Sequence, residues 1–158
     1  MSEYSAKVIW QRNANEDFLK NQYSRGHNWE FDGGAVIAAS AAPSIVPAPW
    51  SVAGNVDPDE AFVASISSCH MLFFLSFASK QRFVVDQYLD NPLGVLDRNS
   101  DGQLAMTRVT LRPQVIFSDG KTPTNDELEK LHQLAHKHCF IANSVKAEVV
   151  IDLHSQPG

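Results

Sequence analysis

Residues 57–79 read DPDEAFVASISSCHMLFFLSFAS and predict one long, apolar helix. Asp57 is a good N-cap residue, and Pro58 suits the first helical position because that position needs no backbone N–H. The apolar residues that recur every three or four positions are Phe62, Ile66, Cys69, Phe73 and Phe77. Further apolar residues widen this surface beyond a single stripe, as in a buried helix. We therefore expect a largely buried central helix with Cys69 in its middle.

Three short strands are expected ahead of this helix. Residues 5–11 alternate polar and apolar side chains, as a strand with one buried face does, and residues 28–32 and 35–38 follow. The turn residues Asp32-Gly33-Gly34 stand between the last two segments. This pattern predicts an N-terminal antiparallel sheet, followed by a proline-containing surface loop over residues 39–56.

A long hairpin is expected after the helix. Residues 82–89 and 103–117 are rich in strand-forming side chains and flank a turn-rich segment, residues 97–102. Pro113 lies inside the second of these segments, and proline lacks the backbone N–H that a central strand needs. We therefore predict an antiparallel hairpin in which Pro113 marks a bulge or an edge.

A second helix and a last strand complete the pattern. The sequence Thr124-Asn-Asp-Glu127 is a capping box, and the one-sided apolar residues after it predict a helix that ends near His138. Residues 145–153 predict a final strand. Antiparallel strands with two interposed helices indicate an α+β fold, and nothing divides residues 1–158 into more than one domain.

The composition is that of an ordinary soluble globular protein. The chain has 158 residues, of which 44% are hydrophobic and 20% are charged. Its net charge of −5 is repelled by phosphate backbones, so we expect no nucleic acid partner. The N-terminus lacks the pattern of a secretory signal, and the apolar stretch Cys69–Phe77 is too short and too interrupted to span a membrane. We therefore predict a cytoplasmic protein with no membrane partner.

Two cysteines are the first candidates for chemistry. Cys69 and Cys139 are far apart in a chain without an export signal, which argues against a structural disulfide. Plain burial is one alternative, because free cysteine is among the most buried residue types. A reactive thiol would need a positive charge or a hydrogen-bond donor beside it. His70 is a poor direct partner, because it points about 100° away from Cys69 around the helix. It is either a polar helix edge or a hydrogen-bonded core histidine.

Histidines near the second cysteine form another candidate cluster. His132 and His136 share a helix face at the spacing that zinc ligands use, and His138 and Cys139 follow them. We favour a solvated helix face, because no acidic pair or Cys-x-x-Cys pair completes a ligand set nearby. The chain has no glycine-rich phosphate loop and no Gly-x-Ser-x-Gly motif, so nucleotide chemistry and serine hydrolysis have no support. We expect neither a metal nor a cofactor.

Three segments carry a resemblance to a known family. Residues 56–69 (VDPDEAFVASISSC), 106–113 (MTRVTLRP) and 139–145 (CFIANSV) are similar to that family's first-cysteine helix, central strand and second-cysteine segment, respectively. On these motifs the chain resembles the OsmC/Ohr superfamily, the osmotically inducible and organic hydroperoxide resistance proteins. The order of strands, helices and cysteines agrees over residues 8–153.

The resemblance implies both an architecture and a set of site residues. The architecture is an OsmC-like fold of antiparallel sheets around a buried central helix, in an intertwined homodimer with two active sites at the interface. By position, Cys69 would be the peroxidatic thiol and Cys139 the resolving thiol. Arg25 would stabilise the thiolate. Asp59, ten residues before the first cysteine, would orient the arginine, with Glu60 as the fallback.

The activity implied by the resemblance is a thiol-dependent peroxidase that reduces organic hydroperoxides. Its second substrate would be a dithiol reductant, with a lipoyl-type dithiol as one candidate. Trp50, Phe62 and Phe73 could line an apolar pocket for the organic part of the peroxide, together with Phe74. The chain departs from the family pattern at Asp59, where glutamate is frequent, and at Phe140, where proline is frequent.

Two other functions stay open at this point. The chain could keep the fold without peroxidase activity and bind a small ligand in the apolar cleft of the dimer. It could also bind a metal through His132, His136 and Cys139. A peroxide-consumption assay separates the first alternative from the peroxidase, and metal analysis tests the second.

Overall fold

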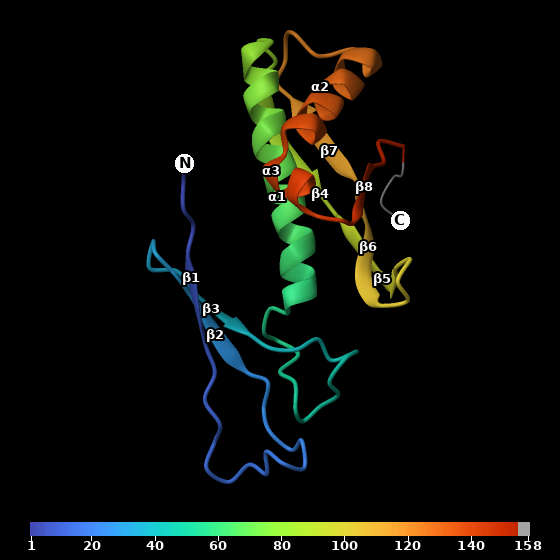
Figure 1. Cartoon of the computed structure of the whole chain (residues 1–158). Coiled ribbons are helices and arrows are strands. Elements are labelled where there is room, and N and C mark those ends of the chain that lie inside the picture. Colours follow the sequence, from blue (N-terminus) through green and yellow to red (C-terminus); the bar gives the residue numbers. More distant parts are fainter. Residues whose placement is uncertain (155–158) are drawn as a thin grey trace. The chain divides into compact units, whose positions relative to one another are not determined.

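The structure is a computed structural model that describes residues 1–154. The chain forms two compact units, Met1–Ala61 and the part that begins at Phe62, and each is described by itself. Figure 1 shows their helices and strands. No observation tests whether residues 1–158 form a single domain, so that expectation stays a prediction.

The first unit is built on a three-stranded antiparallel sheet. Its strands are β1 (Ala6–Ile9), β2 (His27–Phe31) and β3 (Val36–Ala39), with β2 in the centre. Gly34 has a φ of +87° in the tight turn between β2 and β3, a conformation that glycine adopts without a steric penalty. The predicted N-terminal sheet is therefore confirmed. No named helix or strand lies between β3 and residue 58 in this described part of the chain, as the prolines predict.

The long helix α1 (Pro58–Lys80) begins with a reciprocal cap. The Asp57 carboxylate accepts the backbone N–H of Glu60 at 2.8 Å, and the Glu60 carboxylate accepts the backbone N–H of Asp57 at 2.9 Å. Both of these N–H groups would otherwise lack a partner at the helix start. The predicted start of the helix is confirmed to the residue.

The burial of α1 differs from the prediction. Its fully buried residues form one stripe at a spacing of four, Ile66, His70, Phe74 and Ala78. Leu72, on another side of the helix, is 61% exposed. The helix carries apolar residues on all sides, but only one side is fully buried within the chain. Helix α1 is therefore less buried than we predicted. The same residues make α1 the one helix within residues 1–154 that is long and apolar enough to cross a membrane, a test that the core helix of a soluble protein also passes.

A long, interrupted hairpin provides most of the second unit's strands. Strand β4 (Val85–Asp90) pairs with β7 (Pro113–Phe117), and β5 (Leu93–Arg98) pairs with β6 (Leu104–Leu111), all antiparallel. The interruption lies where Asp90 faces Pro113, and the Asp90 carboxylate there accepts the backbone N–H of Arg112 at 2.6 Å. Pro113 therefore marks an irregularity at the predicted position.

Two helices return the chain to this sheet. Helix α2 (Asn125–His138) starts at the predicted capping box, in which the Thr124 side chain accepts from the Glu127 backbone and the Glu127 side chain accepts from Thr124. Helix α3 (Phe140–Ser144) follows, and β8 (Glu148–Ile151) then pairs with β6 in parallel. The final strand is thus confirmed, but its pairing is not antiparallel, because a helical crossover reverses the chain direction before β8.

Two apolar clusters pack α1 against the rest of the second unit. One contains Phe74 and Ala78 of α1 with Phe83 and the α2 residues Leu131 and Ala135. The other joins Ile66 of α1 to Val109 and Leu111 of β6. All of these side chains are 3% exposed or less. Helix α1 is therefore fixed on one side by α2 and by the sheet.

Gly94 allows β5 to pack closely against side chains of α1 and β6. A Cβ atom there would lie 2.5 Å from Val63 Cγ2 and 2.7 Å from Met106 Sδ. We expect Gly94→Ala to lower the free energy of unfolding by about 1–3 kcal/mol, because neither contact fits without a shift of packed side chains. Urea unfolding measures this loss. Gly33→Ala is the matched control, since nothing lies within 4 Å of a Cβ at that position, and an equal loss in the two variants would contradict the account.

Candidate functional site

Cys69 lies in the middle of α1, half-buried, with a free thiol. Cys139 is fully buried, also with a free thiol, at the junction where α2 ends and α3 begins. Its sulfur accepts the backbone N–H of Ala142 at 3.4 Å. Burial, followed by a hydrogen bond with the Cys69 side chain, raises the pKa of Cys139 to about 11. The Cys69 thiol is therefore one of the groups that raise the pKa of Cys139, which stays protonated at neutral pH.

Arg25 belongs to the first unit and is held by its own loop. Its guanidinium donates to the backbone carbonyl oxygens of Tyr23 and Asn21 and, at 2.6 Å, to Oδ1 of Asn21. The guanidinium carbon also lies 3.7 Å from the centre of the Tyr23 ring, a cation–π contact. These contacts fix the cation without a carboxylate.

The two predicted carboxylates do not pair with Arg25 in this structure. The Glu60 carboxylate caps α1, as described above. Asp59 is half-buried in the first turn of the helix, and no ion pair between it and Arg25 exists in residues 1–154. The three residues are therefore not brought together, because the arginine is satisfied by carbonyl groups nearby in sequence and Glu60 by the helix end.

The predicted pocket residues lie in different surroundings. Trp50 is half-buried in the first unit, where its carbonyl oxygen accepts the backbone N–H of Arg25 at 2.8 Å. Phe62 packs with the cluster of Ile66, whereas Phe73 packs with the cluster of Phe74. Phe74 itself is fully buried, so it lines no open pocket.

Arg25 lines an aromatic pocket that the sequence did not indicate. This pocket of about 500 Å³ lies within the first unit, and its aromatic walls are Trp10, Phe18 and Tyr23. The three rings contact one another, with centroids 4.6–6.0 Å apart. The sequence signal for this pocket was the presence of these three aromatic residues ahead of the first predicted turn. They were missed because strand periodicity assigns only Trp10 to an element.

Glu16 organises the loop that carries this pocket. Its carboxylate accepts the backbone N–H of Ser24 at 2.8 Å and that of Asn13 at 3.0 Å. These hydrogen bonds, the one from Ser24 above all, hold the pKa of Glu16 below its usual value. The loop is therefore folded around an anion, and the indole N–H of Trp10 closes it by donating to the Ser24 carbonyl oxygen at 2.8 Å.

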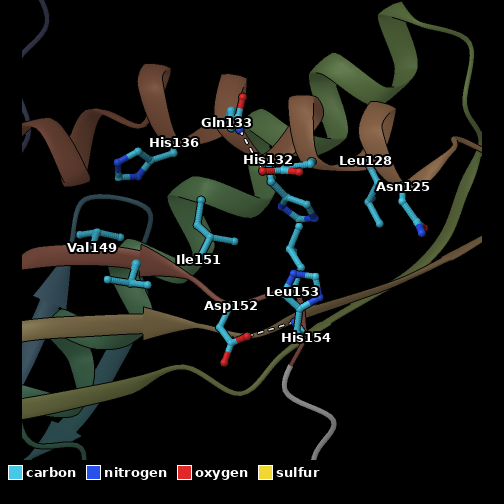
Figure 2. Close-up of a pocket in the computed structure, with 12 residues that line it drawn as sticks. Asn125, Leu128, His132, Gln133, His136, Val149, Ile151, Asp152, Leu153 and His154 are labelled. Atoms are coloured by element: carbon cyan, nitrogen blue, oxygen red, sulfur yellow. Dashed lines mark hydrogen bonds between the residues drawn. The ribbon is translucent and has the colours of Figure 1, made fainter.

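A second pocket, of about 600 Å³, lies between α2 and β8 (Figure 2). His132 and His136 line it from α2, while Asp152 and His154 line it beyond the end of β8. The predicted solvated helix face is wrong at His132, which is only 1% exposed and whose Nδ1 atom is hydrogen-bonded to His70 at 3.0 Å. No group of three or more potential ligand side chains in residues 1–154 could hold a metal ion. The geometry therefore gives the metal-binding alternative no support.

Known proteins share sequence and fold with this chain. The family described as OsmC-like protein matches residues 52–154, which include both cysteines. An OsmC-like protein of unknown function from Vibrio cholerae has 60% sequence identity and a TM-score of 0.95, over 96% of this chain and 99% of that one. No curated protein matches the chain.

More distant structures share the fold. The organic hydroperoxide resistance protein OhrB of Bacillus subtilis is 18% identical, with a TM-score of 0.65 over 94% of this chain and 97% of that one. An organic hydroperoxide resistance protein OsmC from Legionella pneumophila is 16% identical, with a TM-score of 0.65 over 96% of each chain. The family match and the Vibrio relative together establish that this chain belongs to the OsmC family.

Proposed function

We propose that this protein is a thiol-dependent peroxidase that reduces organic hydroperoxides. The observation that carries the proposal is a pair of free thiols, one half-exposed and one buried, of which the first raises the pKa of the second. Membership of the OsmC family, whose relatives include organic hydroperoxide resistance proteins, supports it. The other site residues are proposed to bind the substrate or to activate the Cys69 thiol.

The proposed reaction uses the two cysteines in turn. The Cys69 thiolate attacks the terminal OH oxygen of the peroxide and the O–O bond breaks, so that Cys69 becomes a sulfenic acid. The alkoxide leaves and takes a proton from solvent to become the alcohol. The Cys139 thiol then attacks the Cys69 sulfur and water leaves, which forms a disulfide. A dithiol reductant, with a lipoyl-type dithiol as one candidate, restores both thiols and becomes a disulfide itself. The cytoplasm, where we expect the protein, keeps such dithiols reduced.

The division of roles follows from burial. Cys139 has a pKa of about 11, so a negligible fraction is thiolate at neutral pH and it is a poor first nucleophile. Cys69 is the more exposed thiol and the one that a substrate can reach. Cys139 is close enough to Cys69 for the Cys69 thiol to raise its pKa, which supports attack on the Cys69 sulfur. We therefore assign the peroxidatic role to Cys69 and the resolving role to Cys139.

The aromatic pocket is the proposed site for the organic part of the substrate. Its walls, Trp10, Phe18 and Tyr23, offer apolar surface, and Arg25 on its rim can donate hydrogen bonds to a peroxide oxygen. Trp50 supports this rim through its contact with the Arg25 backbone. Phe62 and Phe73 remain proposed substrate contacts from the neighbourhood of Cys69 on α1.

Arg25 has a testable role in activating Cys69. We expect Arg25→Met to raise the pH midpoint of Cys69 alkylation by about one unit or more, because a positive charge near a thiolate favours ionisation. Asp59→Ala should leave the midpoint nearly unchanged, because Arg25 is held by Asn21 and Tyr23 rather than by Asp59. Arg12→Met is the matched control, since Arg12 donates only to carbonyl groups of the same loop. A midpoint that is equal in wild type and Arg25→Met would remove Arg25 from the site.

We also propose that the chain forms an intertwined homodimer. Helix α1 leaves apolar side chains such as Leu72 exposed, and β5 and β8 are sheet edges without a partner in residues 1–154. A second copy would cover both kinds of surface. Light scattering at micromolar concentration should give twice the 17.5 kDa mass of one chain. A monomeric mass would contradict the proposal.

A coupled assay tests the activity itself. Purified protein with a dithiol should consume an organic hydroperoxide, such as cumene hydroperoxide, many times per protein molecule. Neither the dithiol alone nor protein whose thiols have been alkylated should do so. A protein that binds the hydroperoxide without consuming it would favour the alternative of a small-ligand binding protein.

A further inference from the structure

Two buried histidines join α1 to α2 beside the thiol pair. Nε2 of His70 and Nδ1 of His132 lie 3.0 Å apart, and the two rings are parallel to within 4° with their centroids 5.3 Å apart. Each residue is only 1% exposed. A hydrogen bond between side chains this deeply buried is a specific contact, because each ring gives up solvent to make it.

The histidines and the cysteines belong to the same pair of helices. His70 directly follows Cys69 on α1. His132 precedes Cys139 by seven residues, which is about two helical turns, so both point to nearly the same side of α2. The contact between the histidines and the contact between the cysteines therefore depend on one relative position of α2 along α1.

Other contacts between the two helices are less specific than this hydrogen bond. They are apolar through Phe74 and Ala78 on α1 and Leu131 and Ala135 on α2, and His138 of α2 makes ring contacts with Phe73 and Phe77. Apolar packing is not directional, so it specifies a position less sharply than a hydrogen bond does. A slip by one helical turn moves a residue by about 5.4 Å, beyond the reach of a hydrogen bond. Only one position satisfies both histidines.

The hydrogen bond between the histidines is also what orients both rings. The outer nitrogens, Nδ1 of His70 and Nε2 of His132, are buried and have no hydrogen-bond partner within residues 1–154. In Figure 2 the His132 ring points from α2 toward β8 and Leu153. His132 also stacks on Phe74 with a centroid distance of 4.3 Å. This stacking holds the plane of the His132 ring but does not fix the position of α2 along α1.

We infer that the hydrogen bond between His70 and His132 sets the register of α2 along α1 and thereby holds the Cys139 thiol against that of Cys69. His70 and His132 are positioning residues, since neither reacts. A single buried polar pair is known to fix the register between helices in this way. The inference rests on the proposed function for the pairing and the use of the two thiols, whereas the hydrogen bond between the histidines is independent of it.

Disulfide formation by diamide tests this role without a peroxide. Diamide takes two electrons and two protons from a pair of thiols and becomes a hydrazine, so the rate reports how readily the two sulfurs meet. In the double variant His70→Phe/His132→Phe each imidazole is replaced by an aromatic ring that cannot make the hydrogen bond. We expect disulfide formation about tenfold to a hundredfold slower than in wild type, because small misplacements of reacting groups cost this much. Thermal stability should be unchanged or higher, because apolar rings replace both buried polar partners.

Two further variants separate positioning from a general effect on the fold. His70→Gln keeps a side chain that can hydrogen-bond to His132. This variant should form the disulfide at most of the wild-type rate. His136→Phe is the matched control, since His136 lies one turn further along α2 and makes no hydrogen bond to α1 in the described residues. A folded double variant that oxidises at the wild-type rate overturns the inference.

A spectroscopic measurement on the wild-type protein does not depend on whether the variants fold. With ¹⁵N-labelled histidine, Nε2 of His70 and Nδ1 of His132 should share one proton, so one nitrogen should be protonated and the other not. The inference would be contradicted if the proton on this pair of nitrogens exchanged freely with water. Because neither test uses a hydroperoxide, a protein that failed the peroxidase assay would still give a result here.

Discussion

Replacing Cys69 with serine should abolish peroxide reduction, with a fall of about a thousandfold or more in the rate of peroxide consumption. A serine hydroxyl is not ionised at neutral pH and cannot form the sulfenic acid on which the cycle depends. The buried Cys139 cannot replace it, because its pKa of about 11 keeps it protonated. The coupled dithiol assay measures this loss directly.

Replacing Cys139 with serine should have a different effect. The first turnover should survive, since Cys69 can still attack the peroxide, and Cys69 should then accumulate as a sulfenic acid or become over-oxidised. A dimedone adduct on Cys69, detected by mass spectrometry, reports the sulfenic acid. Equal loss of the first turnover in both variants would be incompatible with the assigned roles.

The protein should lose stability as the pH falls from about 6.5 toward 4. Burial, together with the nearby His136, lowers the pKa of His70 to about 4, and burial, together with His70, lowers that of His132 to about 3. In the unfolded chain both pKa values return to about 6.5. Between these limits the unfolded chain binds more protons than the folded one, so acid favours unfolding. Each histidine should lower the free energy of unfolding by on the order of 2 kcal/mol between pH 7 and pH 5.

Urea unfolding at the two pH values measures this loss. Other titratable groups face the histidine pair, namely His136 on α2 and, across the pocket, Asp152 and His154. The double variant His70→Phe/His132→Phe is therefore the control, since it keeps these neighbours and removes only the pair. Its stability should change much less between pH 7 and pH 5. The same acid loss in the variant and in wild type would show that the pair is not responsible.

Local features of the fold could be predicted from the sequence. Asp57 with Glu60 and Thr124 with Glu127 cap their helices as predicted, because the partners are three residues apart and the contact needs no tertiary structure. The N-terminal sheet and the hairpin followed from alternation and turn residues. The parallel pairing of β8 with β6 did not, because it depends on where a helical crossover returns the chain.

The site was predictable only in part, for the same physical reason. The resemblance selected both cysteines, and their pairing stays a prediction, which the influence of Cys69 on the pKa of Cys139 supports. Of the two interpretations of His70, the hydrogen-bonded core histidine is correct, but its partner lies 62 residues away and could not be read from helix spacing. Arg25 was predicted to pair with Asp59, whereas carbonyl groups within four residues satisfy it first.

The central claim is that Cys69 and Cys139 form a redox pair driven by an organic hydroperoxide. Intact mass measurement of the reduced protein, before and after one equivalent of cumene hydroperoxide, tests it most directly. A disulfide within one chain removes two hydrogens, so the mass should fall by about two daltons and a dithiol should restore it. Peptide mapping should place the link between Cys69 and Cys139. An unchanged mass, or a gain of one oxygen that Cys139 does not resolve, would contradict the account.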